Sequence, residues 1–298
     1  MVLRMRPRPA FWDGRRLWAI YEAAIGRSTI VGMTDVDIGT TQLFVEEVGN
    51  GPLALVMHGG LGLDHTYLTP WLDGLGARRR LAYYDHRGCG RSAEVPADTI
   101  TMTQLADDAD RLREALGGGR VTVIGHSYGG FVALQYAATY PDCVDHLILL
   151  DTAPAGDYLD ELDTYARAHG ATEEMLSGEE PATDEEFAAS FRRVAPLYFV
   201  EWDEALFDQM FKATRYRRAA GVASSEEWAR WSAVSQLAHV TAPTLVVVGS
   251  DDWITPPAQA KRIAEGIPGS TLHLVPTAGH FPWIEDPSLV PRLCDFLA

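Results

Sequence analysis

Short apolar runs recur along the chain, and segments with the residue spacing of helices lie between them. The runs cover 53–57, 81–84, 121–124, 147–150 and 245–248, and each is apolar almost throughout. Strands that are apolar on both faces are typical of a parallel sheet covered by helices on both sides. The alternation of strands and helices therefore predicts an α/β fold with a doubly wound, mostly parallel sheet.

Local signals mark a hairpin and two helices in the first half of the chain. Residues 36–48 alternate between apolar and polar around Gly39, which predicts two short strands joined as a hairpin. Thr101 and Gln104 have the spacing of a capping box, which predicts a helix start. A second helix is expected over residues 128–140, because a proline follows and ends it.

The strand pattern disappears between residues 152 and 239 and resumes afterwards. Two pairs within this stretch, Thr183 with Glu186 and Ser224 with Glu227, have capping-box spacing and predict helix starts. The stretch is therefore predicted to be all helical.

These patterns divide the chain into three parts. We expect residues 33–151 and 240–298 to form one α/β core, and residues 152–239 to form a helical cap inserted after the sixth strand. Residues 1–32 are expected to be an N-terminal extension that packs on the body or on a second subunit. A homo-oligomer formed through this extension is a hypothesis that the sequence leaves open.

Composition and charge exclude several functional classes. The chain has 298 residues, of which 47% are hydrophobic, and this length allows a core that needs no metal or disulfide. The formal net charge is -16, and no basic block with interleaved aromatic residues is present, so nucleic acid is not an expected partner. The stretch 157–240 holds 17 acidic and 8 basic residues, which places much of the negative charge on the cap.

Targeting signals and cysteine usage favour a cytoplasmic protein. No apolar run is long enough for a membrane span, and no apolar segment of the kind found in secretory signals follows the N-terminal arginines. Cys89, Cys143 and Cys294 lack the C-x-x-C spacing of zinc or redox sites and are expected to be free thiols.

The strongest chemical signal lies in residues 121–130, Val-Thr-Val-Ile-Gly-His-Ser-Tyr-Gly-Gly. A buried strand runs here into Gly-x-Ser-x-Gly and then into a helix. This context is typical of a nucleophile elbow, a strained turn that lifts the serine hydroxyl above the sheet. Ser127 is the predicted nucleophile.

A serine nucleophile requires a base, and the base requires an orienting carboxylate. Asp252 follows the strand at 244–248, and His280 follows the next strand, so both are expected at the sheet edge where α/β proteins build their sites. The chain order Ser, Asp, His matches that of an elbow-type triad. Asp251 and Asp151 remain alternative acids, although Asp151 is better interpreted as the hinge into the cap.

The oxyanion hole needs two backbone N–H groups. The amide of Tyr128 supplies one, and Gly60 in His-Gly-Gly-Leu-Gly at 58–62 is the predicted second, with Leu61 as the alternative. This glycine-rich loop lacks the lysine of a phosphate-binding loop, so no cofactor is expected. No metal is expected either, because the histidines beside the site lack ligand spacing.

Together these motifs resemble the α/β-hydrolase superfamily and, within it, the proline iminopeptidase-like group. Besides the elbow, the resemblance rests on three stretches, 58–62, Asp-His-Arg-Gly-Cys-Gly-Arg-Ser at 85–92, and Gly-His-Phe-Pro-Trp-Ile-Glu-Asp-Pro at 279–287. It implies an α/β-hydrolase fold and a serine hydrolase that cleaves small esters, amides or short peptides, with N-terminal proline as the specific substrate feature. Leu61 and Tyr128 depart from the group, which usually has proline and tryptophan there.

The resemblance also implies that cap glutamates bind the free amine of the substrate. Glu204 is a candidate, together with Glu201, Glu226 and Glu227. Leu61 is a further candidate for substrate binding, and an apolar pocket is expected to be lined by tryptophans, for which Trp253, Trp202, Trp228 and Trp231 are the candidates. A carboxylesterase or lactonase without peptidase activity is the alternative function, and a ligand-sensing binding protein is a third.

Overall fold

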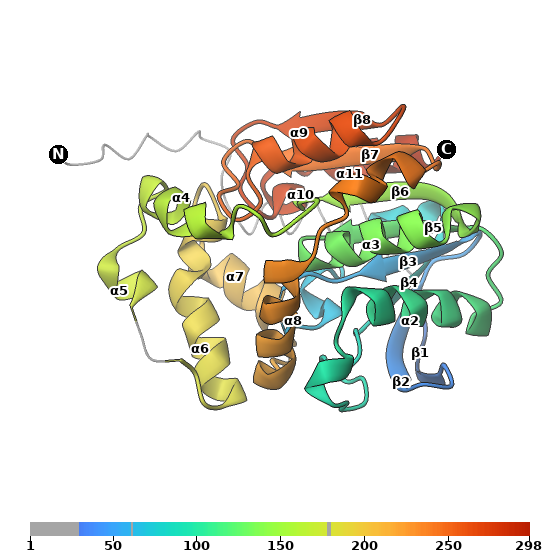
Figure 1. Ribbon diagram of the computed structural model, residues 1–298, viewed down its shortest axis with the longest axis horizontal. Coiled ribbons are helices and arrows are strands. Elements are labelled where there is room, and N and C mark those ends of the chain that lie inside the picture. The colour runs from blue at the N-terminus through green and yellow to red at the C-terminus, as the bar shows by residue number, and fades with distance from the viewer. Residues whose placement is uncertain (1–29, 61, 178–179) are drawn as a thin grey trace.

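An eight-stranded sheet forms the centre of the molecule. The computed structural model describes residues 30–60, 62–177 and 180–298. The strand order is β1-β2-β4-β3-β5-β6-β7-β8, and only β2 runs antiparallel to its neighbours (Figure 1). The doubly wound, mostly parallel sheet predicted from the sequence is therefore confirmed. The strands are β1 (Ile30–Asp37), β2 (Gln42–Val48), β3 (Leu53–Met57), β4 (Arg80–Tyr84), β5 (Val121–His126), β6 (Val144–Leu150), β7 (Thr244–Gly249) and β8 (Thr271–Val275).

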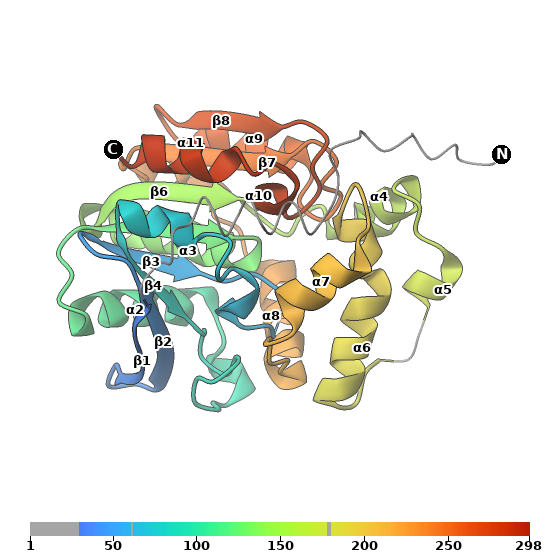
Figure 2. The same ribbon diagram turned by 180° about the vertical axis from the view of Figure 1, so that it is seen from behind.

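Two hydrophobic cores lie on opposite faces of this sheet, because successive strand residues point to alternate sides. In β3, Leu55 packs in the core that contains Phe131 of α3, whereas Val56 packs in the core that contains Trp71 and Trp283. Figures 1 and 2 show these two faces. The helices that flank the sheet are α2 (Met102–Ala115), α3 (Tyr128–Thr139), α9 (Pro257–Gly266), α10 (Pro282–Glu285) and α11 (Leu289–Phe296).

A helical segment follows β6, as predicted. Between β6 and β7 the described residues form helices and an isolated bridge but no strand. These helices gather at one end of the sheet, beyond the carboxyl ends of its parallel strands (Figures 1 and 2). The division into core, cap and extension stays a prediction, and β1 starts at Ile30, ahead of residue 33. The helices are α4 (Leu162–Ala168), α5 (Glu173–Leu176), α6 (Asp184–Val194), α7 (Glu204–Phe211) and α8 (Arg218–Arg230).

Several local predictions are confirmed. The hairpin at 36–48 is the antiparallel pair of β1 and β2. The side chains of Thr101 and Thr183 cap α2 and α6, each accepting a hydrogen bond of 3.2 Å from the backbone N–H three residues on. The helix expected at 128–140 is α3.

One predicted helix start is wrong. α8 begins at Arg218, so Ser224 lies buried inside the helix rather than at its cap. The first amides find acceptors elsewhere in the fold: that of Arg218 donates to Asp184, and that of Arg217 donates to the carbonyl of Gly62. Because these tertiary partners satisfy the helix end, the local Ser–Glu spacing does not determine where α8 begins.

Among the described residues, none of the helices combines the length and the apolar character needed to cross a membrane. Residues 1–29 lie outside the described part of the chain, and so does most of the predicted N-terminal extension.

A buried ionic cluster anchors the loop after β4. Asp85 accepts a hydrogen bond from the Arg91 amide at 2.7 Å, and its other oxygen contacts Nδ1 of His65 at 2.6 Å. His65 Nε2 lies 3.3 Å from a carboxylate oxygen of Glu46. Burial alone would lower the pKa of His65, but the hydrogen bonds to these two carboxylates outweigh it and raise the pKa to about 9.

The charge of His65 makes a pH-dependent contribution to stability. Because the folded pKa lies above the ordinary value of 6.5, the contribution is complete below about pH 6.5 and is lost as the pH rises toward 9. We expect His65→Gln to lower the free energy of unfolding by up to about 3 kcal/mol more at pH 6 than at pH 9.5. Urea denaturation of both proteins at the two pH values measures this difference. His239→Gln, at an exposed histidine, is the control. An equal loss for His65→Gln at both pH values would contradict the charged cluster.

Candidate active site

A strained turn joins β5 to α3 and carries Ser127. Its backbone has φ 53° and ψ −120°, a conformation that L residues adopt rarely. The flanking glycines permit it, because a Cβ on Gly125 would lie 2.4 Å from the carbonyl oxygen of Gly129, and one on Gly129 would lie 2.1 Å from that of Met57. The sequence therefore folds here into the tight strand–turn–helix geometry expected of a nucleophile elbow.

The loops after β7 and β8 bring Asp252 and His280 together. Nδ1 of His280 lies 2.9 Å from Oδ2 of Asp252, and both side chains are buried. Thr255 supports the carboxylate through its hydroxyl, at 2.6 Å, and through its backbone N–H. Burial by itself would raise the pKa of Asp252, but His280 and the Thr255 hydrogen bonds outweigh it and hold the pKa below its usual value. Asp252 is therefore suited to stabilise a cationic imidazole.

The two alternative acids occupy different surroundings. Asp251 is exposed and accepts a hydrogen bond from Ser250. Asp151 is buried at the end of β6, and its Oδ1 accepts the amide hydrogen of Gly249 at 2.9 Å. The hydrogen bond from the imidazole goes to Asp252.

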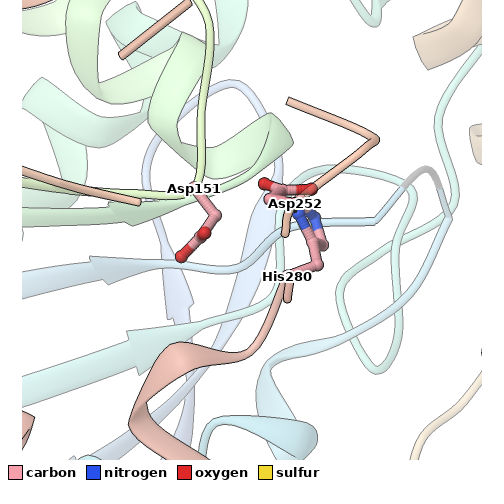
Figure 3. A group of neighbouring side chains, drawn as sticks. All are labelled: Asp151, Asp252 and His280. Atoms are coloured by element: carbon pink, nitrogen blue, oxygen red, sulfur yellow. Dashed lines mark hydrogen bonds and ion pairs between the residues drawn. The ribbon is translucent and has the colours of Figure 1, made fainter. Parts of the chain in front are cut away.

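Figure 3 shows Asp151 beside Asp252 and His280, with one ligand atom of each within 4.8 Å of the others. Such a group has the spacing of a metal site. Burial, and then the charge of Asp252, raises the pKa of Asp151 well above its usual value. Nδ1 of His280 is hydrogen-bonded to Asp252, and Oδ1 of Asp151 accepts the Gly249 amide hydrogen, so all three side chains have partners within the protein.

Ser127 and His280 open onto one cavity of about 440 Å³ between the sheet edge and the helices that follow β6. Gly60 and Tyr128 line the same cavity. The structure therefore brings together four of the residues that the sequence singled out, and Asp252 lies behind His280. Leu61 lies outside the described residues.

The surroundings of Gly60 and Tyr128 suit a site for developing negative charge. Tyr128 is the first residue of α3, so its amide has no acceptor within the helix, and the positive end of the helix dipole lies here. Gly60 has φ +62°, and a Cβ there would lie 2.9 Å from the side chain of Leu63. The preceding glycine, Gly59, allows this loop to pass close to the elbow, because a Cβ there would lie 2.7 Å from Cβ of Ser127.

A hydrogen-bonded chain that no pattern in the sequence indicates links three site loops. The Gly59 amide donates to the Tyr67 hydroxyl at 2.7 Å, and this hydroxyl lies 2.6 Å from Nδ1 of His126. Nε2 of His126 lies 3.0 Å from the carbonyl oxygen of His280, so Nε2 must carry the hydrogen and Nδ1 must accept from Tyr67. Burial lowers the pKa of His126 well below its usual value, in agreement with a neutral ring.

A half-buried glutamate, Glu285, fixes the loop that carries His280. Glu285 accepts hydrogen bonds from the amides of Gly279, at 2.6 Å, and Val200, at 2.7 Å. Burial raises the pKa of Glu285 to about 7. In the sequence, Glu285 is marked only by its position within the 279–287 motif. Its hydrogen-bond partners, such as Val200, follow from the fold and not from any sequence pattern.

Of the remaining candidates for substrate binding, Trp228 lines the cavity, and the other described ones do not. Glu204 is exposed on α7 and pairs with Arg192 at 2.8 Å, and Trp253 is buried with its indole N–H donating to the Leu197 carbonyl at 2.9 Å. Glu227 accepts the Met102 amide and so serves α2. Glu201 and Glu226 do not line the cavity either.

Comparison with known proteins shows which family shares this arrangement. The alpha/beta hydrolase fold family matches residues 53–287. A proline iminopeptidase of Pestalotiopsis fici is 32% identical over 275 residues, covering 86% of this chain and 96% of that protein. A putative carbamate hydrolase of Caulobacter sp. is 28% identical, covering 81% and 90% of the two chains. A thermophilic esterase from Thermogutta terrifontis superposes with a TM-score of 0.69 at 27% identity, covering 90% of this chain and 98% of that one. The chain therefore belongs to the α/β-hydrolase family, in its proline iminopeptidase-like group, and is a hydrolase.

Proposed function

We propose that the chain is a serine hydrolase that cleaves small carboxylic esters through an acyl-enzyme. One observation carries this proposal: Ser127, on its strained turn, lines the same cavity as His280, and Nδ1 of His280 is hydrogen-bonded to Asp252. A nucleophile, a base and an orienting carboxylate in this relation are the parts that acyl transfer requires.

The proposed reaction has two halves. In the first, Nε2 of His280 takes the proton of the Ser127 hydroxyl as the oxygen attacks the ester carbonyl, and His280 then returns that proton to the departing alcohol. In the second, a water molecule attacks the acyl-enzyme with the same proton transfers, which releases the acid and regenerates Ser127. Asp252 holds Nδ1–H of His280 and stabilises the imidazolium, while the amides of Gly60 and Tyr128 stabilise the oxyanion.

Cleavage of an N-terminal proline is the second candidate, because the relative from Pestalotiopsis fici carries that activity in its name. The composition of the cavity favours the ester. Among the described residues, no aspartate or glutamate lines it. A substrate ammonium would lose its hydration there without gaining a carboxylate partner.

A ligand-sensing protein with an unused triad is the third candidate, and it would bind small esters without turning them over.

The triad is tested by removing its members one at a time. We expect Ser127→Ala to lower kcat for 4-nitrophenyl hexanoate by more than about 10⁴-fold, and Asp252→Asn to lower it by about 10⁴-fold because the imidazole loses its orientation and charge partner. Asp251→Asn, which changes the exposed neighbour, serves as the matched control. Unchanged turnover in Ser127→Ala, with circular dichroism showing an intact fold, would overturn the proposal. Binding of the ester by the wild type without turnover would favour the ligand-sensing alternative.

The choice between ester and prolyl peptide is tested with a blocked substrate. We expect rapid hydrolysis of 4-nitrophenyl hexanoate and no preference for prolyl 4-nitroanilide over its N-acetylated form, because no described carboxylate lines the cavity to bind the amine. The measurement is kcat/KM for each substrate, with Ser127→Ala as the background. A loss of about tenfold or more on N-acetylation would indicate a carboxylate that recognises the ammonium and would favour the iminopeptidase.

A further inference from the structure

Beyond the triad, the cap supplies the walls of the active-site cavity. Its apolar lining includes Leu162 of α4, Met175 and Leu176 of α5, and Phe187 and Phe191 of α6. These side chains suit the methylene groups of an acyl chain, because burial of apolar surface is favourable without specific geometry. The acyl portion of the substrate is therefore expected to extend from Ser127 toward α5 and α6.

One arginine stands out in this apolar lining. Apart from the histidines, Arg193 of α6 is the one ionisable cation or carboxylate among the described residues that line the cavity. Its Nε donates to the Met175 carbonyl at 3.3 Å, which directs the side chain toward α5. Arg193 is also exposed to solvent, whereas His280, which lines the same cavity, is buried.

The charge of Arg193 is not neutralised within the described structure. No described carboxylate forms an ion pair with it, although the cap is rich in acidic residues. Its neighbour Arg192 forms ion pairs with both Glu204 and Asp208 and does not line the cavity. Of these two adjacent arginines on α6, the one that lines the cavity is thus the one without an ion pair to a described residue.

An arginine without an ion pair in a largely apolar cavity lining favours a ligand with an anionic end. Arginine binds carboxylates through two parallel hydrogen bonds, and such charge-assisted pairs are stronger than neutral ones. At physiological ionic strength the Debye length is about 8 Å, so a charge on a bound ligand interacts chiefly with the groups closest to it, and Arg193 is the cation among those that line the cavity. An ammonium group in the same place would meet a like charge.

We propose that Arg193 determines specificity by pairing with a carboxylate at the far end of the acyl chain, so that the substrates are monoesters of dicarboxylic acids with an apolar middle. This inference rests on the proposed serine hydrolase function and names its substrate class. The ester carbonyl lies at Ser127, the methylene groups lie along α5 and α6, and the terminal carboxylate meets the guanidinium of Arg193. Pairing of Arg193 with a carboxylate excludes a role for the cavity in binding a free amine.

The test uses three 4-nitrophenyl esters of equal chain length: hexanoate, the adipate monoester and 6-aminohexanoate, which end in a methyl, a carboxylate and an ammonium. For the wild type at neutral pH we expect kcat/KM for the adipate monoester to exceed that for 6-aminohexanoate by about tenfold or more. We expect Arg193→Gln to lower the adipate-to-hexanoate ratio by about tenfold, through KM, and Arg193→Glu to reverse the preference toward 6-aminohexanoate. Arg192→Gln should leave all three values unchanged.

The outcomes separate this inference from the function on which it rests. Hexanoate turnover that depends on Ser127, combined with an adipate-to-hexanoate ratio that Arg193→Gln leaves unchanged, would overturn the role of Arg193 and keep the serine hydrolase. If no ester is turned over, calorimetric binding of monomethyl adipate and methyl hexanoate to the wild type and to Arg193→Gln gives the same comparison without catalysis. Equal affinities in the two proteins would then overturn the role of Arg193 as well.

Discussion

The left-handed backbone of Ser127 is the constraint on which the rest of the site depends. A non-glycine residue holds such a conformation only where the surrounding structure enforces it, and the enforcement comes from both sides of the turn. The Ser127 N–H donates to the Leu150 carbonyl of β6, and the Ser127 carbonyl accepts from Gly130 and from the Thr152 hydroxyl. Glycine on either side lets α3 approach β3 and β5 closely. The central strands of the sheet therefore hold the serine above their carboxyl ends.

The hydrogen-bonded chain through Tyr67 and His126 extends this constraint to the neighbouring loops. It ties the loop that carries Gly60 and the loop that carries His280 to the residue next to the nucleophile. The two links that His126 makes are both satisfied by one neutral tautomer, with the hydrogen on Nε2, so this buried ring joins the elbow to both neighbouring loops. The acid–histidine pair gains similar support from Thr255 and from Glu285. Rigid support of this kind is what acyl transfer needs, since the reacting groups must be held close to productive geometry.

Sequence patterns predicted most of the fold because the relevant signals are local. Apolar runs indicate buried parallel strands, and the side chain of Thr101 caps α2 where the spacing placed it. The start of α8 was predicted wrongly because its cap comes from Asp184 and Gly62, which lie far away in the sequence. The same limit applies to the site. The order Ser127, Asp252, His280 is visible in the sequence, but the pairing of Tyr67 with His126 joins residues whose contact depends on the sheet order. The lining of the cavity by Arg193 rather than Glu204 likewise depends on how α6 packs over the sheet edge.

The central claim is that Ser127 is the activated nucleophile, and covalent labelling tests it most directly. A hexylphosphonofluoridate monoester reacts with an activated serine by transferring its phosphonyl group and releasing fluoride. We expect intact-mass measurement to show one adduct per chain, formed in parallel with the loss of 4-nitrophenyl hexanoate hydrolysis, and peptide mapping to place it on Ser127. An adduct on another residue, or hydrolysis that continues in fully labelled protein, would contradict the account.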